Sequence, residues 1–145
     1  MYIEVIHNNK SIASESFKTL RSNIQFSNYG QSIKTIVVTS SNPNEGKSEV
    51  SINLAASLAQ QKKKVLIIDA DMRKPTQHKI IGVMNTEGLS KFLLRETGAE
   101  AIQHLNILDV KFDVLTSGPV PPNPSEMLAS MAMEQSIKAF VEDYD

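Results

Sequence analysis

The residues with the clearest chemical potential are Gly46, Lys47 and Ser48, which end a polar segment that begins at Ser40. The residues before it, 35–39 (TIVVT), are mostly β-branched, as is typical of a buried parallel strand. After it, apolar residues recur at roughly helical spacing: Val50, Ile52, Leu54, Ala55, Leu58 and Ala59. A strand, a tight polar loop and a helix with Gly-Lys-Ser at the turn indicate a phosphate-binding P-loop.

The chemistry of such a loop requires these residue types. Backbone N–H groups of the loop and the open N-terminus of the helix bind an anion, and the helix dipole favours it. Lys47 is expected to reach the β- and γ-phosphates of a nucleotide, and the Ser48 hydroxyl to bind Mg²⁺. The general motif has a glycine where this chain has Ser41. The alternative is a chance Gly-Lys-Ser, which the flanking strand and helix make the minority interpretation.

Two carboxylates follow a second apolar run. Residues 65–68 (VLII) predict a buried strand, and Asp69 and Asp71 come directly after it. The carboxyl ends of parallel strands are where open α/β sheets bind ligands. Either carboxylate could orient a Mg²⁺-bound water or accept a proton from an attacking hydroxyl. Alternatively, Asp71 only caps the following turn.

Length and composition set the class of protein. The 145 residues predict a single domain over 1–145, and a net charge of −1 argues against a general nucleic-acid-binding surface. There is no cysteine, so thiolate chemistry and disulfides are excluded. No apolar run is long enough to span a bilayer and no signal peptide is evident, so a cytoplasmic location is expected.

The remaining pattern predicts the other elements. Residues 1–11 read as an arm, 28–32 as a loop and 76–82 as irregular chain, with a third strand at 112–116. Helices are expected at 14–25 with Ser14 as N-cap, from 88 to 94, from Ser125 onward, and at 134–141. In the helix after Ser125, Met127, Leu128 and Met131 are expected to face inward.

Four stretches together resemble the bacterial tyrosine kinases of the polysaccharide-export type. They are ESFKTLRSNIQFS (15–27), SSNPNEGKSEVSINLA (40–55), VLIIDADMRKP (65–75) and GPVPPNPSEML (118–128). They are similar to that family's N-terminal helix, Walker A loop, Walker A′ strand and proline-rich loop, and they occur in the family's order. The resemblance implies an α/β, P-loop NTPase-like fold of three αβα layers around a mostly parallel sheet.

The resemblance also implies roles for single residues. Lys47, Asp69 and Asp71 would be catalytic, and Ser48, Asp69 and Asp71 would bind Mg²⁺. The loop residues expected to bind ATP are Asn42, Asn44, Glu45, Gly46, Lys47, Ser48 and Glu49. The family's Glu-x-x-Arg-x-x-Arg oligomer contact is similar to Glu15, Lys18 and Arg21, with a lysine at its middle position. Lysine lacks the planar fork of arginine.

Two loop residues depart from the family's pattern. Asn44 replaces a glycine, and Asn is the non-glycine residue that best tolerates positive φ. Glu49 stands where the family usually has threonine. At an effective dielectric of ~20, two like charges about 5 Å apart cost roughly 3 kcal/mol, which would weaken nucleotide binding about a hundredfold unless Glu49 turns away.

The family's Walker B strand would open at Tyr144-Asp145, so the domain is expected to be incomplete at its C-terminal end, without that strand and the tyrosine-rich tail. The leading interpretation is an ATP-dependent protein-tyrosine kinase domain that autophosphorylates in capsule or exopolysaccharide synthesis. Its expected partners are itself, protein tyrosine substrates and a transmembrane activator that holds it at the inner face of the plasma membrane, with no nucleic acid.

Two alternatives remain open. One is a catalytically inactive nucleotide-binding or interaction module of the same system. The other is a partition- or division-type P-loop ATPase, against which Asn42 counts, because those proteins carry a signature lysine there.

Overall fold

The computed structural model describes residues 1–27 and 32–145, so most of the loop expected at 28–32 lies outside the described residues. The sheet comprises β1 (Leu66–Ile68), β2 (Ile102–Ile107) and β3 (Val110–Leu115), in the order β1-β3-β2. β1 runs parallel to β3, with Ile67 opposite Val114, and β2 runs antiparallel to β3. The sheet of the described residues is therefore small and mixed, where a mostly parallel one was expected.

The β2–β3 hairpin was not predicted from the sequence. Its two connecting residues, Leu108 and Asp109, both have positive φ, at 47° and 67°. Two consecutive residues of that kind form the tight turn whose twist suits a hairpin. The sequence does not predict this turn because it lacks the Asn-Gly or Asp-Gly pair that usually signals a two-residue hairpin loop.

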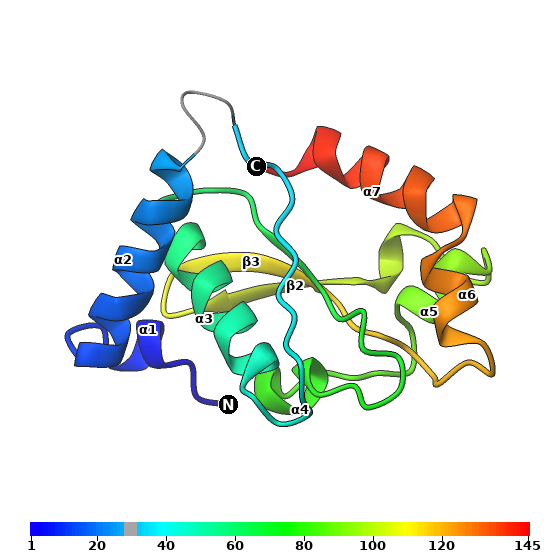
Figure 1. The fold of residues 1–145 in the computed structure, drawn as a ribbon, viewed down its shortest axis with the longest axis horizontal. Helices are drawn as coiled ribbons and strands as arrows, with labels where there is room; N and C mark the ends of the chain where they lie inside the picture. Colours follow the sequence, from blue (N-terminus) through cyan, green and yellow to red (C-terminus); the bar gives the residue numbers. More distant parts are fainter. Residues whose placement is uncertain (28–31) are drawn as a thin grey trace.

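Helices cover both faces of the sheet, as the three-layer prediction requires (Figure 1). Side chains of one strand alternate between faces, so Ile67 and Val114 enter one apolar core while Leu115 enters the other. The first core is closed by α3 (Lys47–Ala59) with α1 (Glu4–His7) and α4 (Gln77–Ile81), and α2 (Ile12–Phe26) packs on α3. The second is closed by α5 (Leu89–Leu93), α6 (Pro124–Leu128) and α7 (Met131–Asp143), with a short 3₁₀ turn, η1, at Ala99–Ala101.

The prediction of a buried parallel strand at 35–39 is wrong for this structure. These residues carry no strand assignment, and Val37 is 82% exposed. In Figure 1 the segment is the cyan coil that leads from the neighbourhood of the C-terminus down to the start of α3. A groove of about 710 Å³ lies between it and β1, so no strand within the described residues is close enough to form ladder hydrogen bonds with it.

The N-terminal residues form part of the core, where an arm was expected. Ile3 and Val5 are fully buried, and α1 is held to α3 because the Val5 N–H donates to Asn53 Oδ1 at 3.0 Å. A four-residue helix is too short for helical periodicity to reveal it in sequence.

Several helix boundaries also differ from expectation. The N-cap of α2 is Ser11, whose Oγ accepts from the Ser14 N–H, while Ser14 is buried. Residues 77–81 form α4 within the segment expected to be irregular. α6 begins at Pro124, and of its predicted inward residues only Met127 is buried; Leu128 and Met131 are exposed. Among the described residues no helix combines the length and the apolar character needed to cross a membrane.

Candidate functional site

The P-loop joins the exposed segment 35–39 to α3. Gly46 is the N-cap of α3 and has φ 81°, in the left-handed region that glycine adopts without strain. Asn44 also has positive φ, at 63°, as expected for an asparagine in place of a glycine. The loop therefore forms with its substituted residue and leaves the first N–H groups of α3 without helical partners, available to an anion.

Asn42 and Glu45 stabilise the loop by hydrogen bonds to each other. The Asn42 backbone N–H donates to Glu45 Oε2 at 3.1 Å, and its side-chain Nδ2 donates to Oε1 at 3.0 Å. These hydrogen bonds hold the pKa of Glu45 below its usual value, since they favour the carboxylate. Asn42, Asn44 and Glu45 are exposed and belong to the loop's outer turn.

Lys47 and Ser48 begin α3 and face inward. Lys47 Nζ donates to Ser40 Oγ at 3.1 Å, so the ammonium group reaches back across the loop. The Ser48 hydroxyl is hydrogen-bonded to the Thr76 hydroxyl, just before α4. Glu49, by contrast, has its side chain exposed on the first turn of α3.

Asp69 is buried directly after β1, with 5% of its surface exposed. Its Oδ2 accepts from the Thr76 and Gln77 N–H groups, at 3.2 and 3.1 Å, and its Oδ1 accepts from the Asp71 N–H at 3.1 Å. Burial raises the pKa of this carboxyl above its usual value, although the three N–H donors oppose the shift. Asp69 thus ties the end of β1 to the start of α4.

Asp71 is exposed, in contrast to Asp69. Its Oδ1 accepts from the Arg73 and Lys74 N–H groups, at 3.3 and 2.9 Å, so it caps the turn that follows β1. The capping role considered from the sequence is therefore present, and Asp71 still lines the same cavity as Asp69.

The structure brings the predicted catalytic and metal-binding residues to one place. Lys47, Ser48, Asp69 and Asp71 all line one end of the groove of about 710 Å³ that separates residues 35–39 from β1. Gln77 lines it as well and was not predicted. The signal that could have found it is Pro75-Thr76 followed by an apolar pair and Gly82, a pattern typical of a short helix that begins at 77.

The donor set fits a magnesium–nucleotide complex. Mg²⁺ is usually held by one or two carboxylates, a hydroxyl, waters and the phosphates themselves. One carboxylate here is buried, one is exposed, and a serine hydroxyl lies at the helix start. Across residues 1–27 and 32–145 no cluster of three His, Cys, Asp or Glu side chains suggests a metal held by protein alone. The residues present therefore suit a metal that arrives with phosphate.

The three residues of the predicted oligomer contact, Glu15, Lys18 and Arg21, lie in two different environments on α2. Lys18 Nζ pairs with Glu15 Oε1 at 2.7 Å on the surface, whereas Arg21 turns toward α3. Arg21 Nη1 donates to the Ser57 carbonyl at 2.8 Å and to its Oγ at 3.0 Å. Arg21 thus makes a contact within the chain.

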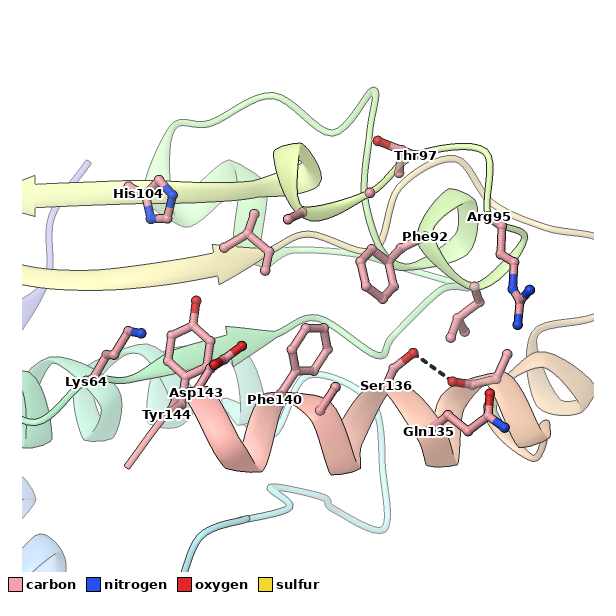
Figure 2. Close-up of a pocket in the computed structure, with 16 residues that line it drawn as sticks. Lys64, Phe92, Arg95, Thr97, His104, Gln135, Ser136, Phe140, Asp143 and Tyr144 are labelled. Atoms are coloured by element: carbon pink, nitrogen blue, oxygen red, sulfur yellow. Dashed lines mark hydrogen bonds between the residues drawn. The ribbon is translucent and has the colours of Figure 1, made fainter.

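A second cleft, of about 620 Å³, lies between α7 on one side and α5 with β2 on the other (Figure 2). Phe92 and Phe140 face each other across it, with ring centroids 5.5 Å apart. At its other end Tyr144 donates from its hydroxyl to Asp113 Oδ2 at 2.7 Å, and His104 Nδ1 lies 2.7 Å from Asp113 Oδ1. The hydrogen bond between Tyr144 and Asp113 holds the end of α7 against the sheet. None of the predicted site residues lines this cleft.

Comparisons with known proteins agree with this fold. The chain is 48% identical over 127 residues to the tyrosine-protein kinase YwqD of Bacillus subtilis (strain 168), an alignment that covers 87% of this chain and 53% of YwqD. The chimerical protein CapA2B2 superposes with a TM-score of 0.90 at 42% identity, over 98% of this chain and 62% of that one. The kinase domain of the Escherichia coli tyrosine kinase ETK superposes with a TM-score of 0.89 at 34% identity, over 100% of this chain and 56% of that one.

The chain thus spans little more than half the length of YwqD and of the ETK kinase domain. Residues 36–144 match the family model described as the CobQ/CobB/MinD/ParA nucleotide binding domain. That match includes the P-loop, both carboxylates and all three strands. The chain belongs to the CobQ/CobB/MinD/ParA family of P-loop nucleotide-binding domains.

Proposed function

We propose that this chain is the ATP-binding part of a bacterial protein-tyrosine kinase that acts in capsule or exopolysaccharide synthesis. The observation that carries the proposal is the meeting of Lys47, Ser48, Asp69 and Asp71 at one end of a single groove. The similarity to YwqD and to the ETK kinase domain supplies the reaction class. The proposed reaction transfers the γ-phosphoryl group of ATP to a tyrosine hydroxyl.

The chain's own residues divide the work of this reaction. The N–H groups at the start of α3 and the Lys47 ammonium bind the phosphates and stabilise the charge that develops on them. Ser48, Asp69 and Asp71 would hold Mg²⁺, which would neutralise phosphate charge when it is bound.

The bond between the γ-phosphorus and the ADP oxygen breaks as the tyrosine oxygen bonds to phosphorus, and the phenolic proton passes to a carboxylate. Asp71 suits that last role because it is exposed to an incoming hydroxyl and directs both of its turn hydrogen bonds to Oδ1.

The groove beside β1 supports the expectation that the site here is partial. The Asp145 N–H donates to the Lys64 carbonyl at 2.9 Å, and Lys34 Nζ donates to the Tyr144 carbonyl at 2.9 Å. A polypeptide continuing past Asp145 would enter the groove between residues 35–39 and β1. Met133, Ile137 and Phe140 of α7 would cover it there. Such a segment would supply the ladder partner that residues 35–39 lack.

The same groove favours a second candidate function for this chain by itself. With β1 open along one edge, the chain could bind nucleotide weakly and act as an inactive interaction module of the same system. Under either function we propose self-association through Glu15 and Lys18 on α2. We also propose a transmembrane partner that keeps the protein in the cytoplasm at the inner face of the plasma membrane.

One experiment separates the two functions. ATP binding with Mg²⁺ and phosphotyrosine formation are measured for this chain and for a version extended past Asp145 with the corresponding residues of YwqD. The kinase proposal predicts phosphotyrosine in the extended version and little or none in the short one. Binding without phosphotyrosine in both would favour the inactive module, and no ATP binding in the extended version would refute the kinase proposal.

Lys47→Met tests the P-loop assignment itself. Because the lysine ammonium binds phosphate directly, ATP affinity is expected to fall at least about tenfold. Lys138→Met, on the exposed face of α7, removes the same charge far from the loop and serves as the control. Equal ATP affinity in the Lys47→Met variant and the parent chain would mean that nucleotide does not bind at this loop.

A further inference from the structure

Gln77, the first residue of α4, connects the two halves of the candidate site. Its side-chain Nε2 donates to the Ser48 carbonyl at 3.0 Å, within the first turn of α3. Its backbone N–H donates to Asp69 Oδ2 at 3.1 Å. A single residue thus bridges the P-loop helix and the buried carboxylate, and only 4% of its surface is exposed.

The other end of the Gln77 amide is a buried acceptor without a donor. Oε1 is shielded from solvent and has no hydrogen-bond partner in the part of the chain that the structure describes. The orientation of the amide follows from the Ser48 carbonyl, an acceptor that requires the nitrogen on its side. A buried acceptor left unpaired destabilises a fold, so its presence calls for a donor that arrives from elsewhere.

The place of Gln77 narrows the identity of that donor. Gln77 lines the same groove as Ser48, Asp69 and Asp71, the three residues proposed to hold Mg²⁺. Mg²⁺ in nucleotide sites keeps several of its waters, and these waters are strong hydrogen-bond donors. Lys47, the charged donor of the P-loop in this groove, is directed to Ser40 Oγ instead.

We propose that Gln77 is a positioning residue for the magnesium–nucleotide complex and that its Oε1 accepts a hydrogen bond from a metal-bound water. This inference rests on the proposed function, since it requires that the groove bind ATP with Mg²⁺. It adds a residue whose Oε1 contributes to ATP binding only when the metal is present. Its hydrogen bonds to Ser48 and Asp69 hold these two residues at positions from which both can bind the same metal ion.

The test compares ATP affinity in Mg²⁺ with ATP affinity in EDTA, by calorimetry, for the whole chain and its extended version. Gln77→Met keeps the length of the side chain but removes both the Oε1 acceptor and the Nε2 donor to the Ser48 carbonyl. It is expected to lower affinity for the Mg²⁺ complex about tenfold, the value of one hydrogen bond to a charged centre, and to leave metal-free affinity within about twofold. Gln77→Glu also loses the Nε2 donor to the Ser48 carbonyl but keeps an acceptor oxygen, so it is expected to retain the preference for Mg²⁺.

Gln135→Met, at an exposed position of α7, is the matched control and is expected to change neither affinity. An equal loss in Mg²⁺ and in EDTA would assign Gln77 a purely structural role and overturn the inference. Unchanged affinities in the Gln77→Met variant would overturn it too.

Should Gln77→Met fail to fold, as judged by circular dichroism, loss of the Mg²⁺ preference in Gln77→Glu would contradict the inference and its retention would support it. If the unaltered extended chain bound no ATP in either condition, the proposed function itself would fail, a result distinct from a Gln77 variant without a metal-specific effect.

Discussion

Asp69 and Asp71 are two residues apart and occupy different environments, which suits them to different tasks. Asp69 is buried and accepts three backbone N–H groups, so its position is fixed by the ends of β1 and α4. Asp71 is exposed and shapes the following turn. A rigid carboxylate is suited to metal binding and an exposed one to an incoming substrate.

Glu49 is expected to weaken nucleotide binding less than its sequence position suggests. Its side chain is exposed on α3, so solvent and salt screen its repulsion of the phosphates. Glu49→Gln is predicted to raise the affinity for ATP with Mg²⁺ by a factor below about ten, well short of the hundredfold estimated for a charge about 5 Å away. Calorimetric titration at low and high salt measures this effect.

Glu142→Gln, which removes one exposed carboxylate from the far end of α7, controls for the change in net charge. A gain that persisted undiminished in high salt would show that Glu49 turns toward the phosphates when they bind.

Among the elements, the loop before α5 and the end of β3 are joined by a close backbone contact. The Leu89 N–H donates to the Thr116 carbonyl at 2.7 Å, and the Asn85 side chain pairs with both the N–H and the carbonyl of Gly118. These hydrogen bonds fix the start of the proline-rich loop that leads into α6 and α7. The contact depends on Gly88, because the backbone there lies directly against the backbone of Thr116 and Gly118.

Gly88→Ala is predicted to destabilise the fold strongly. An added Cβ would lie 2.3 Å from the Gly118 nitrogen and 2.4 Å from the Thr116 oxygen, so one backbone must move. The expected loss is about 3 kcal/mol in the free energy of unfolding, measured by urea denaturation. Gly82→Ala is the control: its Cβ would meet nothing within 4 Å, and only its left-handed φ of 75° costs about 1 kcal/mol. Equal losses in the two variants would contradict the steric argument.

The packing of α2 on α3 is predicted to depend on Arg21. Arg21→Ala removes two hydrogen bonds from a charged donor to Ser57, and we expect a loss of about 2 kcal/mol in the free energy of unfolding. Lys18→Ala, three residues away, breaks an ion pair with Glu15 and an exposed hydrogen bond to the Asn9 carbonyl, and is expected to cost less than about 1 kcal/mol. If both variants unfolded at the same urea concentration, the contribution of the Arg21 contact to this packing would be negligible.

In the molecule as a whole, the C-terminal residues hold separate elements together. Tyr144 binds Asp113 of β3 through its hydroxyl, Lys34 through its carbonyl and the end of α7 through its N–H. Burial, together with the hydrogen bond to Asp113, raises the pKa of the Tyr144 hydroxyl above its ordinary value of about 10. The folded protein therefore holds this proton more tightly than the unfolded chain.

The sign of the pH dependence follows from this shift. Below pH ~10 the hydroxyl is protonated in both states and its stabilising contribution is fully present; above pH ~10 the unfolded chain loses the proton first and the contribution declines. Tyr144→Phe is thus predicted to cost about 1 kcal/mol at pH 8 and progressively less between pH 10 and 11. Urea denaturation of both proteins across this range measures the difference. A difference that stayed constant to pH 11 would mean that the Tyr144 hydroxyl titrates as in the unfolded chain.

Local signals were sufficient for the elements that bear the phosphate-binding chemistry. The α3 helix begins at Lys47 as predicted, because Gly46 and the apolar spacing after it are strong signals within a short window. The strand at 65–68 and its following carboxylates were predicted for the same reason. By contrast, α1, α4 and the β2–β3 hairpin were missed, because each is short and is stabilised by contacts with distant residues.

Residues 35–39 mark the limit of that local reasoning. Their β-branched side chains predict a buried strand, but a strand exists only where a neighbour supplies ladder hydrogen bonds, and a groove lies on that side of β1. The sequence by itself determined the P-loop, the two carboxylates and the class of fold, since these depend on residues close together in the chain. Only the tertiary structure decided that Arg21 binds α3, that Asp69 is buried, and that Gln77 joins the two halves of the site, because each depends on packing between distant segments.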